Sequence, residues 1–186
     1  QSQLWTGSHH DLAMDVARPE TVLGDFQNAS LTHHGVTSRM FQRDDAYFVH
    51  TEGPDGKMAD FQVKYVLGVT PLQQYMVEFD RPSGHPANEI ARLQVLRVSW
   101  DTLAKRWFHL DPPDVSDKLD PDDELHWTGI LQRWNNMCAD CHSTNLQRRF
   151  DPQTGAYHTT FSEIDMSCEA CHGPGNLHVQ LGTAKS

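Results

Sequence analysis

The sequence lacks the basic residues and the long apolar runs that mark two common classes of protein. Its 186 residues contain 15 lysines and arginines against 25 aspartates and glutamates, a formal net charge of -10. Nucleic acids and anionic membrane surfaces attract basic faces, so this balance argues against both as partners. No apolar run approaches the roughly 20 residues needed to span a bilayer. We therefore expect neither a nucleic-acid partner nor a membrane span in this chain.

Apolar residues are also scarce, and the chain opens without a secretory signal. The apolar fraction is only 38%, so a bound cofactor with a large apolar face would supply part of the missing core. The first residues, QSQLWTG, contain neither the basic region nor the apolar stretch of a signal peptide. A mature secreted chain would lack them too.

Cysteine is limited to four residues, and these form the most informative pattern in the sequence. They make two C-x-x-C pairs, each followed at once by histidine: Cys138, Cys141 and His142, then Cys168, Cys171 and His172. Thioether attachment of haem needs two thiols beneath its two vinyl groups and an imidazole that reaches iron from the same side. Residues i, i+3 and i+4 of a helical turn provide that arrangement. The repeat predicts at least two covalently attached c-type haems, with His142 and His172 as proximal ligands.

Three other uses of the cysteines compete with haem attachment. A zinc site of four cysteines is one, but the pairs lie further apart than the roughly 15 to 20 residues usual in such sites, and zinc does not explain the two histidines. Two disulfides are another possibility in a secreted protein. A thioredoxin-like redox motif would need a βαβ context that the sequence does not indicate.

The middle of the chain has the pattern of antiparallel strands. Alternating segments rich in β-branched and aromatic residues are separated by short turn signals; they cover residues 36–41, 46–51, 59–67, 74–79 and 92–100. We divide the chain into a helical N-terminal segment (1–34), an antiparallel β insertion (35–110) and a haem-binding region (111–186). The predicted fold class is α+β, with short haem-bearing helices and haem-packed loops around an inserted β meander.

The two cysteine motifs are expected to lie on or beside short helices. The first helix runs over residues 121–135, with Asp120 as N-cap and Pro121 in the first turn. The second begins with Ser162 as N-cap and ends at Gly173-Pro174. The acidic, proline-rich stretch 111–124 before them is interpreted as a solvated loop, because it lacks the ordered spacing and glycine of a calcium-binding loop.

The motif regions resemble a known family. HWTGILQRWNNMCADCHSTN (126–145) and FSEIDMSCEACHGPGNLH (161–178) are similar to multihaem cytochromes of the c-552/c-554-like group, whose relatives often carry tetratricopeptide repeats. TEGPDGKMADF (51–61) and GVTPLQQY (68–75) match its β region. LWTGSHHDLAM (4–14) resembles a tryptophan–serine–histidine segment that usually follows an earlier C-x-x-C-H. That earlier motif is missing here, so the chain is either a fragment or a lineage with fewer haems.

Each iron also needs a sixth ligand or an open site. His178 is a candidate because it lies beyond a glycine–proline turn and could reach a neighbouring haem. By resemblance, His10 fits the family's serine-x-histidine pattern, with His9 as its alternative. His126 would face the first motif from the predicted helix, and His33 and His34 are further candidates. The other histidines (His50, His85, His109 and His158) are interpreted as surface or sheet residues, and Met14, Met40, Met58 and Met76 as core.

These residues favour an electron carrier over an enzyme. Two six-coordinate, bis-histidine irons would leave no position for a substrate, and the chain would pass electrons in a respiratory or extracellular chain. One alternative is a nitrite- or hydroxylamine-type oxidoreductase with one open haem; another is a subunit that polymerises into a haem wire through exposed strand edges. Expected partners are redox proteins, neighbouring haem domains or further copies. The resemblance implies the periplasm or cell surface of a bacterium.

Overall fold

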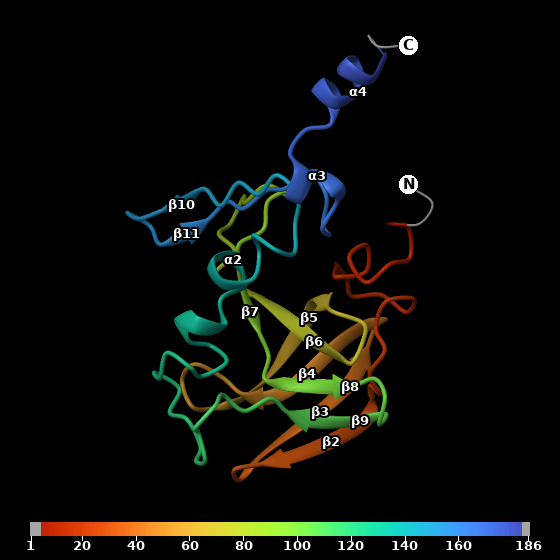
Figure 1. Ribbon diagram of the computed structural model, residues 1–186. Helices are drawn as coiled ribbons and strands as arrows, with labels where there is room; N and C mark the ends of the chain where they lie inside the picture. Colours follow the sequence, from red (N-terminus) through yellow and green to blue (C-terminus); the bar gives the residue numbers. More distant parts are fainter. Residues whose placement is uncertain (1–4, 184–186) are drawn as a thin grey trace.

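Residues 5–183 of the computed structural model are described here, without the side chains of residues 177 and 178. This part of the chain consists mainly of one strongly curled antiparallel sheet (Figure 1). Its strands are β1 (Met14–Val16), β2 (Gln27–His33), β3 (Val36–Arg43), β4 (Ala46–Glu52), β5 (Met58–Leu67), β6 (Leu72–Phe79), β7 (Arg92–Val95), β8 (Val98–Asp101) and β9 (Arg106–His109). A separate hairpin is formed by β10 (Phe150–Asp151) and β11 (Ala156–Tyr157).

The strand order explains the curled shape. Strands pair in the order β2-β3-β4-β5-β6-β8-β9, while β1 pairs with β5 and β7 with β6. The end strands β2 and β9 come into contact, so the sheet is nearly closed. Two-residue turns with positive φ join the first hairpins: His34 (46°) and Gly35 (79°) between β2 and β3, and Asp44 (50°) and Asp45 (61°) between β3 and β4. Such turns match the right-handed twist of paired strands.

The buried residues form two clusters, and only the second includes residues of the cysteine motifs. The first is built from aromatic side chains in edge-to-face contact, among them Phe26, Tyr75 and Trp107. The second joins β6 and β7 to Trp134 and Ala139, with Cys138 packed against it. Three of the four methionines predicted as core (Met14, Met40 and Met76) are buried, whereas Met58 is exposed.

The predicted α+β class is wrong, because the protein is mostly β and its helices are few and short. Four of the five predicted strand segments lie in single strands, whereas residues 92–100 are divided between β7 and β8; the sheet also includes β1 and β2 from the segment 1–34 that we expected to be helical. Among the described residues the helical elements are the 3₁₀ turn η1 (Ile130–Gln132), α2 (Trp134–Met137), α3 (Cys168–His172) and α4 (Asn176–Thr183). The division into three regions stays a prediction.

Local hydrogen bonds explain why residues 121–129 do not form the expected helix. The Asp123 carboxylate accepts a hydrogen bond from the Leu125 amide (2.7 Å), and the His126 ring accepts one from the Thr128 amide (3.3 Å). Side chains that bond nearby backbone in this way compete with helix formation. Gly129 lies so close to the carbonyls of residues 123 and 124 that no side chain would fit there.

The second expected helix begins later than its sequence indicated. Ser167, and not Ser162, is the N-cap of α3, because residues before it pair instead: Glu163 bridges to Thr144, and Thr160 to Gln147. The end at Gly173 is confirmed; this residue adopts a φ of 72°, which glycine reaches without strain.

No helix in the described part of the chain has the length and apolar character needed to cross a membrane.

Candidate haem-attachment site

The first C-x-x-C-H motif continues the turn that α2 begins. The Cys138 amide donates to the Trp134 carbonyl (3.0 Å), and the amides of Cys141 and His142 both donate to the Cys138 carbonyl (3.1 Å each). The motif is therefore wound as one helical turn, which places two thiols and an imidazole at the i, i+3 and i+4 spacing that thioether attachment needs.

Two fully buried residues anchor this turn to the sheet. Trp134 packs in the second core cluster. Asn135 accepts a hydrogen bond from the Leu93 amide (2.9 Å) and donates to the Ala91 carbonyl and the Thr159 hydroxyl (3.0 Å each). The first motif is thus held against β7 by both apolar and polar contacts.

Burial shifts the pKa of two groups in the first motif, Cys138 and His142. It raises the pKa of the half-buried Cys138 thiol, an effect to which Cys141 adds. It lowers the pKa of His142, with a backbone group of Ala13 acting the other way. Neutral imidazole is the form that binds metal, and His142 Nδ1 is buried without a hydrogen-bond partner. A thiol with a raised pKa is a weak nucleophile, which argues against thiolate catalysis here.

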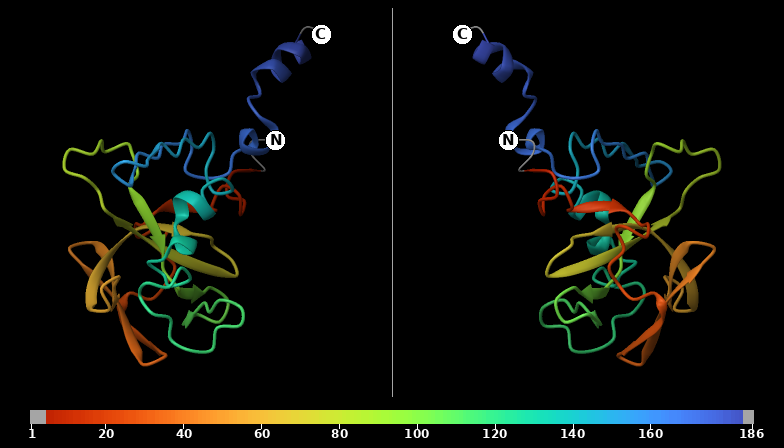
Figure 2. Two further views of the ribbon diagram at one scale, coloured as in Figure 1. Left: turned by 90° about the vertical axis from the view of Figure 1, so that its left-hand side faces the viewer. Right: turned by 90° about the vertical axis from the view of Figure 1, so that its right-hand side faces the viewer.

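The second motif lies on α3, at one end of the molecule. The Ser167 hydroxyl caps the helix by accepting from the Glu169 amide (3.3 Å). Cys168, Cys171 and His172 are all exposed, and α3 has no buried residue. In Figures 1 and 2, α3 and α4 project away from the sheet, with the segment before β1 beside α3.

One side chain connects the two motifs. Thr144, two residues after His142, is buried, and its hydroxyl lies 2.9 Å from the Ser167 amide nitrogen and 3.1 Å from Ser167 Oγ. The same hydroxyl donates to the Asp165 carbonyl (2.9 Å). Thr144 thereby fixes the N-cap of the second motif relative to the first.

Replacing Thr144 by valine is expected to loosen this connection while keeping the side chain's shape. The half-buried Ser167 amide would lose its acceptor, which costs about 1 kcal/mol. We therefore expect exchange of the Ser167 amide proton to quicken by about tenfold, measured by hydrogen exchange. Thr37→Val, which removes an exposed hydroxyl bonded to Thr32, should leave that exchange rate unchanged; equal rates in wild type and Thr144→Val would contradict the proposed connection.

The residues present fit haem c. Each motif offers two free thiols and one imidazole within a single turn. Exposed apolar side chains adjoin the motifs, including Met137 (56% exposed) before the first and Val179 (62%) and Leu181 (57%) after the second. A porphyrin bound there would cover apolar surface that the fold leaves open.

Two of the predicted distal ligands, His9 and His10, belong to an N-terminal segment whose other residues act on groups of the motif region. His9 and His10 are exposed in the turns before β1, and in the same segment Ala13 acts on His142 and Asp11 on Asp165. His178 belongs to α4, but its side chain lies outside the described residues. These ligand assignments stay predictions.

His126, His33 and His34 lie together in a different place. All three line one pocket, with His109, on the side of the sheet formed by β2 and β9. His126 is buried and its Nδ1 lies 2.7 Å from the Thr128 hydroxyl. The predicted helix that would have directed His126 toward the first motif is absent. The structural argument for His126 as an axial ligand therefore no longer applies, and the assignment itself stays a prediction.

Burial lowers the pKa of His126 and of His109, chiefly by desolvation. Their folded pKa values therefore lie below the ordinary value of 6.5. As the pH falls below 6.5, the unfolded chain binds these protons first, so stability present above that pH is progressively lost. We expect urea midpoints to drop between pH 7 and pH 5, and to drop less in His126→Gln. An unchanged pH slope in that variant would contradict the assignment.

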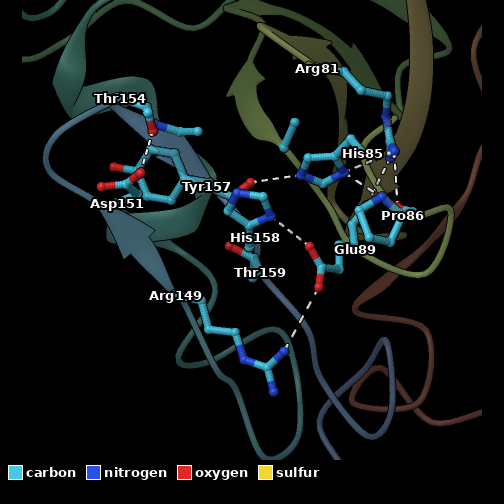
Figure 3. Close-up of polar contacts among 12 residues, drawn as sticks. Arg81, His85, Pro86, Glu89, Arg149, Asp151, Thr154, Tyr157, His158 and Thr159 are labelled. Carbon is cyan, nitrogen blue, oxygen red and sulfur yellow. Dashed lines mark hydrogen bonds and ion pairs between the residues drawn. The ribbon is translucent and has the colours of Figure 1, made fainter. Parts of the chain in front are cut away.

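Sequence reasoning missed the polar contacts that position the site. Asn135, Thr144 and Ser167 act through partners far away along the chain, for which the sequence carries no signal. It also missed two groups of close ligand-type side chains: His33, His109 and Asp111, and His85, Glu89 and His158. Figure 3 shows the second group, which joins the β6–β7 loop to β11 and the residues after it.

The competing uses of the cysteines find no support in the geometry. All four thiols are free, and neither group of three close ligand-type side chains within residues 5–183 contains a cysteine.

Comparison with known proteins agrees with the site. No curated protein matches the chain, and no solved structure does. A family model described as cytochrome c554 and c-prime matches residues 109–173, a stretch that contains both C-x-x-C-H motifs entire. This match, together with the paired motifs, indicates a c-type cytochrome that uses haem c.

Proposed function

We propose that the protein transfers electrons through two covalently attached haems, each with histidine on both faces of the iron. The observation that carries the proposal is the pair of C-x-x-C-H turns joined by the hydroxyl of Thr144. A shared side chain between two attachment sites keeps them at a fixed separation, which electron transfer between cofactors requires. When bound, haem supplies reversible one-electron chemistry. Cys138, Cys141, Cys168 and Cys171 would hold it, with His142 and His172 as axial ligands.

The charges around the second motif favour a low reduction potential. Burial, and then Asp11, Glu163 and Asp15, raise the pKa of Asp165, which is three residues before Cys168. Burial disfavours charge of either sign, but the neighbouring carboxylates of Asp11, Glu163 and Asp15 would stabilise the more positive, oxidised state of a nearby iron. Two imidazole ligands also give a lower reduction potential than a histidine–methionine pair does.

By resemblance, we also propose that the protein acts in the periplasm or at the cell surface. The net charge of -10 favours redox partners with a basic docking face. Neighbouring haem domains or further copies of the chain would extend the path beyond two irons.

Haem content and spin state test the proposal together. The pyridine haemochrome spectrum and the intact mass should give two haems per chain, and the reduced protein should be low-spin and six-coordinate. A colourless polypeptide whose mass equals that of its amino acids would overturn haem attachment. High-spin, five-coordinate iron would overturn the bis-histidine relay and favour an oxidoreductase with an open haem; nitrite and hydroxylamine turnover would then be measured.

A further inference from the structure

The nearly closed sheet has a seam between its two end strands. β2 and β9 contact one another but are not neighbours in the hydrogen-bonded strand order. His33 is the last residue of β2 and His109 the last residue of β9. The seam lies at the end of the molecule opposite α3 (Figures 1 and 2), so it is distinct from the haem-attachment site.

Three ligand-type side chains converge on this seam. His33 Nε2 and His109 Nδ1 each lie 2.8 Å from the same oxygen of Asp111. The two imidazole rings stack at 4.2 Å with 15° between their planes, and the three ligand atoms all lie within 4.8 Å of one another. Tetrahedral coordination at about 2.0–2.1 Å separates ligand atoms by about 3.3 Å, so binding would require Asp111 to move away by about 0.5 Å and the stacked rings to tilt until both nitrogens face the ion.

A cavity opens beside these three residues. Its volume is about 70 Å³, enough for one or two water molecules. Its walls are largely apolar, formed by residues such as Leu31, Leu96, Val98 and Trp127, with His34 and His126 as further imidazoles. A fourth ligand to an ion at the seam would therefore be a water, a small anion or His34, whose ring centre is 3.9 Å from that of His33.

We propose that His33, His109 and Asp111 bind a divalent cation of the zinc class, which fastens β2 to β9. Two imidazoles and one carboxylate with an open fourth position form a ligand set typical of zinc. The ion would replace the shared hydrogen bonds to Asp111 and supply the cross-strand link that the backbone does not make here.

Nearby cations are already engaged with other groups. Arg97, whose charge also acts on Asp111, donates to the carbonyls of Leu110 (3.2 Å) and Leu125 (2.8 Å). Lys118, which lines the cavity, pairs with Glu52 at 2.6 Å. The hydrogen bonds of Arg97 go to neutral carbonyls and not to the ligand atoms, although its charge acts on both His109 and Asp111.

The group in Figure 3 differs from the seam in this respect. Both ring nitrogens of His85 are engaged: Nε2 lies 2.9 Å from the Tyr157 carbonyl oxygen, and Nδ1 lies 3.1 Å from Arg81. Glu89 pairs with His158 (2.7 Å) and lies 3.8 Å from Arg149. Two guanidinium groups beside the ligand atoms oppose a cation there, so this group serves as a matched control.

Zinc titration of the haem-loaded protein, stripped of loose metal with EDTA, tests the proposal. Calorimetry should find one high-affinity zinc site that is absent in His109→Gln and in Asp111→Asn but kept in His158→Gln. Zinc at about 100 times its dissociation constant should raise the Tm of the wild type by about 5–11 °C, and that of the two seam variants by none. Each shift is measured against the same variant without zinc, so a variant's own loss of stability does not obscure it.

Two results would overturn the proposal: equal zinc affinity and stoichiometry in the wild type and both seam variants, or loss of the site in His158→Gln alone. The haem content is measured in the same samples and does not depend on this outcome, so failure of the zinc site and failure of the electron-transfer proposal are separable.

Discussion

Replacing Cys138 and Cys141 together by alanine is expected to halve the haem content of the protein. If each C-x-x-C-H turn holds one haem by thioether bonds, the double variant loses one attachment and keeps the other. The haemochrome absorbance per polypeptide should fall by about half, and the intact mass should drop by the mass of one haem. The matching double variant of Cys168 and Cys171 should give the same result, and all four changes together should give a colourless chain.

The two double variants should differ in stability. The first motif is part of the second core cluster, so loss of its haem removes packing next to buried residues. The second lies on a helix without buried residues, and its loss should have a smaller effect on the Tm. Met137→Ala, a change at an exposed neighbour of Cys138, is the control and should retain both haems. Two haems remaining in either double variant would rule out thioether attachment at that motif.

The strands could be predicted from the sequence because their signal is local. Alternation of buried and half-buried side chains, as in β4 (Ala46–Glu52), follows the alternation of residue types in the sequence, which also contains the turn residues Asp44 and Asp45. The helices could not be predicted in this way. Over residues 121–129 the capping pattern predicted a helix that does not form. The side chains of Asp123 and His126 accept hydrogen bonds from nearby backbone amides, and Gly129 packs closely against the carbonyls of residues 123 and 124.

The same difference between local and long-range signals decides which parts of the candidate site could be predicted. Each haem-attachment motif consists of five consecutive residues, so its chemistry can be recognised from the sequence. The groups that position the motifs cannot be recognised in this way: Thr144 meets Ser167, and Asn135 meets Leu93, only after the chain has folded. His109 looked like an ordinary sheet residue because its partner His33 lies on the opposite edge of the sheet, and the seam exists only because the sheet curls.

Asn135→Ala is expected to destabilise the protein strongly. The side chain is fully buried and makes three hydrogen bonds. The Thr159 hydroxyl keeps a second partner in the Arg148 carbonyl (3.0 Å), but the Leu93 amide and the Ala91 carbonyl would each lose the Asn135 side chain.

A buried backbone group without a hydrogen-bond partner costs about 1–3 kcal/mol. For the two groups we expect the free energy of unfolding to fall by about 3 kcal/mol, which lowers the Tm by roughly 6–12 °C. Urea unfolding followed by far-ultraviolet circular dichroism measures it. The neighbouring Asn136 is exposed and makes one side-chain bond, to the Tyr157 hydroxyl (2.8 Å), so Asn136→Ala should change stability by no more than about 0.5 kcal/mol. Similar losses in the two variants would mean that the first motif is held to β7 by the packing of Trp134 alone, and that the buried amide contributes no more than a surface hydrogen bond.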